Sequence, residues 1–97
     1  MLQENPVSVA VLKSQETGNG QMHISYFIKS EEYTDDVPHK GFGIEAKLYL
    51  DGELVDDITV DDVVCSQSEA VALIELLSRN TVTPVALKDV IEDFISA

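Results

Sequence analysis

A β-hairpin is predicted by the sequence Phe42-Gly43-Ile44-Glu45-Ala46-Lys47-Leu48-Tyr49-Leu50-Asp51-Gly52-Glu53. Even-numbered residues of this stretch are apolar, and residues two apart share one face of a strand, so the strand should have one buried and one wet face. Asp51-Gly52 is the strongest short hairpin signal in the chain, because both residue types tolerate positive φ. The returning strand is expected from Glu53 to Val60.

The register of this hairpin depends on the length of its loop. A two-residue loop at Asp51-Gly52 would pair Leu48 with Val55 and place Asp57 opposite Ala46. A three-residue loop would instead make the apolar pairs Leu48 with Leu54, Ile44 with Ile58 and Phe42 with Val60. A slip of one residue would turn all these side chains to the other face. We therefore favour the three-residue loop, with Gly52 in the left-handed conformation as a G1 bulge.

A second hairpin is predicted at the N-terminus. Val7 to Lys13 and Gln21 to Lys29 alternate like strands, with Val7, Val9 and Val11 on one face of the first strand, and Thr17-Gly18-Asn19-Gly20 has the composition of a turn. The stretch from Ser30 to Lys40 has no periodicity and contains Pro38, so we expect an exposed loop there, the longest in the domain.

Two helices are predicted after the strands. Ser66-Gln67-Ser68-Glu69 fits a capping box, and the helix behind it should run to about Arg79 and end at Asn80. Thr83 is a suitable N-cap for the second helix, with Pro84 in its first position. That helix should direct an apolar stripe to the core: Leu87, Val90, Ile91, Phe94 and Ile95. The first four of these side chains should be mostly buried. The prediction is one α+β domain over residues 1–97, a four-stranded antiparallel sheet of two hairpins followed by two C-terminal helices packed on one face.

The chain is strongly acidic, with a formal net charge of −12, and the charge is unevenly distributed. Residues 1–30 sum to zero, residues 31–62 to −9 and residues 63–97 to −3. Nucleic acids and anionic membranes bind mainly through cationic side chains, so direct binding to either is disfavoured. A basic protein is the partner that this field would attract, although acidity also serves solubility alone.

No motif for catalysis, cofactor binding or metal binding is present. His23 and His39 lack ligand spacing, so we expect a strand-surface residue and a loop residue. Cys65, the single cysteine, is expected to be a small, partly buried residue, because no local base supports a catalytic thiol. Gly41-Phe42-Gly43 lacks the lysine of a phosphate loop and is expected to mark a bend or bulge. We expect no enzyme and no cofactor.

Three features of the sequence bear on the cellular location. A single thiol cannot form an intramolecular disulfide, no signal peptide is visible, and no apolar run approaches a membrane span. A cytoplasmic location is therefore expected.

Two acidic groups are candidates for partner binding. Asp56 and Asp57, with Asp61-Asp62 further on, bracket the fourth strand, where negative charge also prevents edge-to-edge aggregation. Asp89, Glu92 and Asp93 lie in the last turns of the final helix, where acids oppose the helix dipole. We predict an interaction module that presents these five residues to a basic partner: Asp89, Glu92, Asp93, Asp56 and Asp57. The alternative is a nucleic-acid mimic that blocks a DNA- or RNA-binding protein, which would need carboxylates spaced like phosphates.

Residues 22–95 also resemble a known family. The resemblance is carried by Phe42-Gly43-Ile44-Glu45, by Asp57-Ile58-Thr59-Val60-Asp61, and by Thr83-Pro84 with the final helix motif Leu87-Lys88-Asp89-Val90-Ile91-Glu92-Asp93-Phe94. These segments are similar to those of a family of short proteins from clostridial-type Firmicutes, which is described as a domain of unknown function. Members usually have tyrosine where this chain has Phe42. The resemblance implies a fold and a source but no activity.

Overall fold

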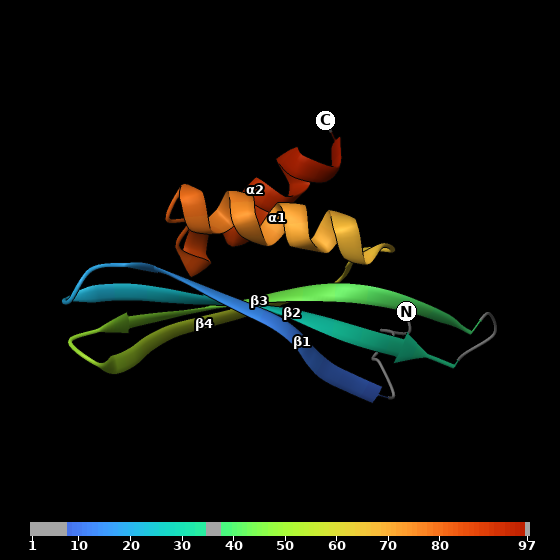
Figure 1. Cartoon of the computed structure of the whole chain (residues 1–97), viewed down its shortest axis with the longest axis horizontal. Helices are drawn as coiled ribbons and strands as arrows, with labels where there is room; N and C mark the ends of the chain where they lie inside the picture. The colour runs from blue at the N-terminus through green and yellow to red at the C-terminus, as the bar shows by residue number, and fades with distance from the viewer. Residues whose placement is uncertain (1–7, 35–37, 97) are drawn as a thin grey trace.

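The sheet and the helices form two layers. The computed structural model describes residues 8–34 and 38–96. Four strands come first, β1 (Ser8–Gly18), β2 (Met22–Tyr33), β3 (His39–Leu50) and β4 (Glu53–Val64), followed by α1 (Gln67–Arg79) and α2 (Pro84–Ser96). The strands form one antiparallel sheet in the order β1-β2-β3-β4, and both helices cover the same face of it (Figure 1). The predicted fold class is confirmed.

The core lies between the helices and the even-numbered residues of β2 and β3. Ile24, Tyr26, Ile28, Ile44 and Ala46 are fully buried against apolar side chains of the helices: Ala70, Leu73, Ile74, Leu77, Leu87 and Ile91. The Tyr26 hydroxyl donates a 2.6 Å hydrogen bond to the Val82 carbonyl, which ties the sheet to the connection between α1 and α2. Val90 and Phe94 were expected to be mostly buried but are only half-buried.

The helix ends follow the predicted capping residues. The Ser66 hydroxyl accepts a 3.2 Å hydrogen bond from the Glu69 amide and lies 3.1 Å from the Glu69 carboxylate. Asn80 ends α1 by donating its amide to the Leu76 carbonyl, and Pro84 occupies the first position of α2. None of the described helices has the length and apolar composition that crossing a membrane would require.

The predicted register of the β3–β4 hairpin is wrong. Leu50 pairs with Glu53 around a two-residue turn, in which Asp51 and Gly52 both have positive φ, as a type I′ turn requires. Val55 is then left over as a bulge, and beyond it Leu48 pairs with Asp56. The bulge shifts the rest of β4 by one residue and so restores apolar cross-strand pairs, which the three-residue loop was expected to do. Ile58 faces Ala46, and Val60 faces Ile44.

The predicted long loop between β2 and β3 is also wrong. β2 continues to Tyr33 and β3 already begins at His39, so most of residues 30–40 lie in the sheet; residues 35–37 fall outside the described part. Glu31 and Tyr33 are buried although they face away from the helices. The side chains that bury them come from β3 and β4, which local periodicity cannot reveal.

Candidate functional site

Two glycines leave space above β3, on the face of the sheet opposite the helices, for side chains from the neighbouring strands. Gly41 pairs with Glu31 of β2, and Gly43 pairs with Lys29. A Cβ atom at Gly43 would lie 2.7 Å from the Glu31 Oε2 atom, and one at Gly41 would overlap the Asp62 carboxylate. The absence of side chains at these two positions therefore gives Glu31 and Asp62 room to meet above the middle of the sheet.

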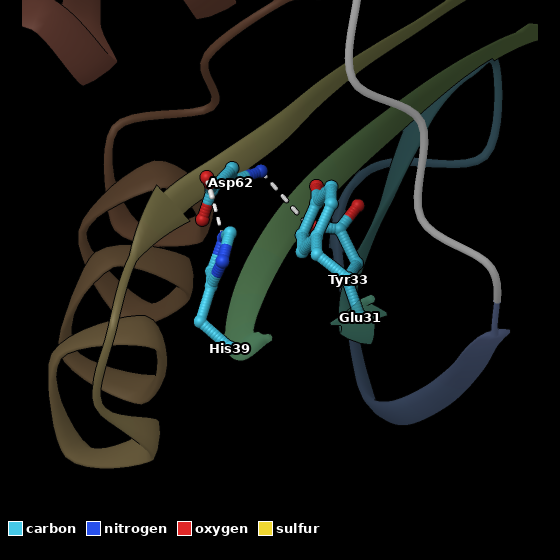
Figure 2. Close-up of polar contacts among 4 residues, drawn as sticks. All are labelled: Glu31, Tyr33, His39 and Asp62. Atoms are coloured by element: carbon cyan, nitrogen blue, oxygen red, sulfur yellow. Dashed lines mark hydrogen bonds and ion pairs between the residues drawn. The ribbon is translucent and has the colours of Figure 1, made fainter. Parts of the chain in front are cut away.

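The Glu31 side chain occupies this space and connects β2 with β4. Its Oε1 atom accepts a 2.8 Å hydrogen bond from the Asp62 amide and a 3.2 Å hydrogen bond from the Tyr33 hydroxyl (Figure 2). Asp62 has φ 53° and lies where the register shifts between Phe42 and Ile44, so this irregular part of β4 is held by a side chain from two strands away. The bulge that was expected at the glycines lies instead in β4, where residues 61–63 stand opposite Gly43 alone, while both glycines pair regularly with β2.

The Glu31 carboxyl is 0% exposed, which changes its proton affinity. Burial, together with the neighbouring Asp61 carboxylate, raises the pKa of Glu31 to about 7. Its Oε2 atom has no hydrogen-bond partner among the described residues. Burial and the nearby Glu31 charge also raise the pKa of Tyr33. Glu31 therefore exchanges its proton near neutral pH, while Tyr33 stays a hydrogen-bond donor.

His39 contacts both Tyr33 and Asp62 of this cluster. Its ring stacks on Tyr33 with centroids 4.6 Å apart and planes 8° from parallel, and its Nε2 atom lies 3.4 Å from Asp62 Oδ2. The expectation of a loop histidine is wrong, because His39 is the first residue of β3 and the stacking fixes its ring. A pocket of about 280 Å³ lies beside it, lined by Glu32, Tyr33, Thr34, Pro38, His39 and Lys40.

A second polar network occupies the same face of the sheet. Lys29 Nζ lies 3.0 Å from Glu45 Oε1. Asp57 shares a hydrogen bond with Glu45, which raises the pKa of Asp57. Although burial opposes it, the hydrogen bonds from Asp57 and Lys29 hold the pKa of Glu45 below its ordinary value. Lys47 lies 5.5 Å from the centre of the Phe27 ring, so the cations in the middle of this face are engaged within the sheet.

The chemistry available to the buried cluster is limited. Glu31 has no solvent-exposed surface, so it cannot reach a substrate without movement of the sheet. Among residues 8–34 and 38–96, no three His, Cys, Asp or Glu side chains are arranged to hold a metal ion. Glu31, Tyr33 and Asp62 instead link β2 to β4 through hydrogen bonds to a carboxyl group that can be titrated, and we call these residues the Glu31 clamp.

Nearly the whole chain matches the model of one protein family. A family model described as a family of unknown function, DUF6514, matches residues 7–97. The chain belongs to the DUF6514 family. Among curated proteins and solved structures, nothing matches it. The expected resemblance to a domain of unknown function is confirmed at this level, while the bacterial source and the helix motif stay predictions.

The five residues predicted to bind a partner lie on two elements of this DUF6514 protein. Asp89, Glu92 and Asp93 are exposed on α2, which packs beside β4. Asp56 is half-buried and, opposite Leu48, lies on the helix side of the sheet, whereas Asp57 points to the other face and joins Glu45. Asp56 therefore lies on the same side of the sheet as α2, whereas Asp57 lies on the opposite side.

The buried cluster of Glu31, Tyr33 and Asp62 and the exposure of Cys65 both differ from what the sequence of this family member predicted. Glu31, Tyr33 and Asp62 were assigned to a loop and to a solvated strand end. The signal that could have found them is Gly41-Phe42-Gly43, because two glycines on one face of a central strand leave space for side chains from its neighbours. Cys65, expected to be partly buried, is exposed between β4 and the Ser66 cap. His23 is a strand-surface residue as predicted, 2.8 Å from Glu16.

Proposed function

We propose that this protein is a cytoplasmic, non-enzymatic interaction module whose β4 and α2 bind a basic segment of a protein partner. The observation that carries the proposal is the composition of β4. This edge strand contains five acidic residues and no lysine or arginine. Charged residues on an edge strand discourage pairing with other strands, and they also provide an electrostatic contact surface.

The adjoining helix extends the same charge. α2 packs beside β4 and exposes Asp89, Glu92 and Asp93 on its outer side. Two of the lysines, Lys29 and Lys40, lie on β2 and β3 and are paired with Glu45 and Glu32. The acids that β4 and α2 carry on the helix side of the sheet, Asp56, Asp89, Glu92 and Asp93, therefore form the surface that we propose for a partner with several lysine or arginine side chains.

Nucleic-acid mimicry is supported less well. A mimic needs carboxylates at the spacing of neighbouring phosphates, roughly 6–7 Å. Asp57 and Asp61, which both contact groups on the open face, are four residues apart, or about 13 Å along an extended strand. The spacing is about twice that of the phosphates, so a flexible basic peptide fits the acids better than a nucleic-acid-binding groove does.

A titration with a synthetic peptide of alternating lysine and serine tests the proposal. We expect amide shifts to concentrate in β4 and α2, and we expect affinity to fall as salt rises, because exposed charges are screened. The triple variant Asp56→Asn/Asp89→Asn/Asp93→Asn should bind at least about tenfold more weakly, the loss from about 1.4 kcal/mol.

A matched control distinguishes a defined surface from general acidity. Glu16→Gln/Glu32→Gln/Glu75→Gln removes the same charge from exposed positions on β1, β2 and α1. This control should bind like the wild type. Equal weakening of both triple variants, or shifts spread over the whole sheet, would contradict the proposed surface. In pull-downs from the source cell, a specific partner should be retained by the wild type and the control but not by the β4–α2 variant.

A further inference from the structure

The opposite edge of the sheet has a different character from β4. β1 is the other edge strand, and it exposes three large apolar side chains: Val9 is 48%, Val11 61% and Leu12 43% exposed. No charged residue lies between Ser8 and Leu12. An extended edge strand with free backbone groups and apolar side chains is a ready template for pairing with another strand.

We propose that β1 pairs antiparallel with β1 of a second copy of this chain, so that two sheets join into one. The charge distribution favours an identical partner. The chain carries −12 in total, but residues 1–30 sum to zero, so β1 is the strand along which two copies can meet with the least repulsion. Lys13 and Glu16 are the charged residues of β1, and they cancel.

The irregularity in β1 defines the register of this pairing. The pairing with β2 shifts between Val11 and Lys13, so the regular part of the edge ends near Leu12. Antiparallel pairing centred on Ala10 places Val9 of each copy opposite Val11 of the other. Both are on the face that also carries Lys29 and Glu31. Cross-strand pairs of β-branched residues stabilise such a ladder.

The resulting dimer has defined geometry. Both helices of one copy cover the same face of its sheet (Figure 1). A two-fold axis through the paired Ala10 residues, perpendicular to the sheet, would therefore keep both helical layers on one side of an eight-stranded sheet. The β4 edges then lie at the two far ends. This interface is independent of the surface proposed for a basic partner, and it would make that binding bivalent.

Sedimentation analysis of the full chain tests the pairing, and we expect a monomer–dimer equilibrium. Because a single strand pair is smaller than a standard interface, the measurement should extend to about 1 mM protein. Val9→Lys/Val11→Lys should shift the dissociation constant at least about tenfold toward monomer by placing four like charges together. Leu54→Lys/Val55→Lys makes the same change at two exposed apolar positions of β4 and should leave the dimer intact.

Cysteine crosslinking tests the register. In a Cys65→Ser background, Ala10→Cys should form a disulfide-linked dimer on mild oxidation, because the two residues face each other at the axis. Ser8→Cys should not, since its counterpart lies at the far end of the pairing. A protein that stays monomeric at 1 mM overturns the proposal, and so does a dimer that dissociates with the β4 lysines but not with the β1 lysines. Crosslinking by Ser8→Cys but not by Ala10→Cys overturns the register.

Discussion

The Glu31 carboxylate of β2 reaches across β3 and accepts a hydrogen bond from the Asp62 amide of β4, 2.8 Å away. The two residues are separated by a strand that normally would place its own side chains between them. Gly41 and Gly43 remove this obstacle, and the carboxyl is buried as a result. Strand geometry, the chain path of β4 and the protonation of Glu31 are therefore coupled.

Glu31→Gln should change how stability depends on pH. The pKa of Glu31 rises from an ordinary 4.5 to about 7 on folding, so the folded state holds the proton more tightly. The stability of the wild type should thus fall as pH rises from about 4.5 through 7, by up to about 3 kcal/mol from this group. Glutamine resembles the protonated acid, so the variant should match the wild type at pH 5 and exceed it at pH 8 in urea melts.

The neighbouring residue provides the control for this experiment. Glu32 is exposed and lies 3.7 Å from Lys40, and Glu32→Gln should shift stability by less than about 0.5 kcal/mol across the same pH range. If Glu31→Gln were less stable than the wild type at every pH, the Asp62 amide would need the negatively charged carboxylate of Glu31. That result would refute the inference that the folded protein is more stable when Glu31 is protonated.

Gly43→Ala should destabilise the protein through contact with Glu31. The new Cβ atom would lie 2.7 Å from Glu31 Oε2 and 3.0 Å from the Val60 carbonyl oxygen, so the glutamate must move. The expected cost is about 1–3 kcal/mol, as for overpacking in a core. Gly20→Ala, where a Cβ meets nothing within 4 Å, should cost much less.

A double-mutant cycle identifies the contact responsible for the Gly43 effect. In a Glu31→Ala background the alanine at position 43 should cost less than it does in the wild type, with a coupling of at least about 0.5 kcal/mol. Additive losses would show that Gly43 is required by the backbone alone.

Tyr26→Phe should weaken the attachment of the helices. The variant removes the donor of a 2.6 Å hydrogen bond and leaves the buried Val82 carbonyl without that partner. Such a loss costs about 1–3 kcal/mol in chemical denaturation. Burial raises the pKa of Tyr26 to about 12, so the bond should persist in mildly alkaline solution. Tyr49→Phe, on the open face beside His23, should have little effect on stability.

The fold was predictable because its signals are local. Asp51-Gly52 specifies a turn through positive φ, and Ser66 with Glu69 specifies a helix start through adjacent hydrogen bonds. The register was not predictable, because Val55 is accommodated as a bulge whose energy depends on both strands. The Glu31 clamp was missed for the same reason: Glu31 and Asp62 are 31 residues apart, and their meeting depends on glycines in a third segment.

Ile91→Ala and Ile95→Ala should separate the buried and exposed sides of α2. Ile91 is 3% exposed and Ile95 is 54% exposed, although both belong to the predicted apolar stripe. Truncation of Ile91 should cost about 2–5 kcal/mol, whereas truncation of Ile95 should cost less than about 1 kcal/mol. Similar losses at both positions would show that α2 is rotated relative to the sheet in solution.

Asp89→Asn/Asp93→Asn should keep or raise the melting temperature. Both residues are exposed on α2, they are four positions apart, and the last turn of α2 contains no basic residue. Neutralising them relieves like-charge repulsion and an unfavourable interaction of Asp93 with the helix dipole, worth together a few tenths of a kcal/mol to about 1 kcal/mol. Glu69→Gln should have the opposite sign, since Glu69 lies in the first turn of α1 and contacts the Ser66 hydroxyl. Both effects should shrink at 1 M salt. A clear loss of stability in the α2 variant would mean that these acids make stabilising contacts within the protein, and they would then be poor candidates for a surface kept for a partner.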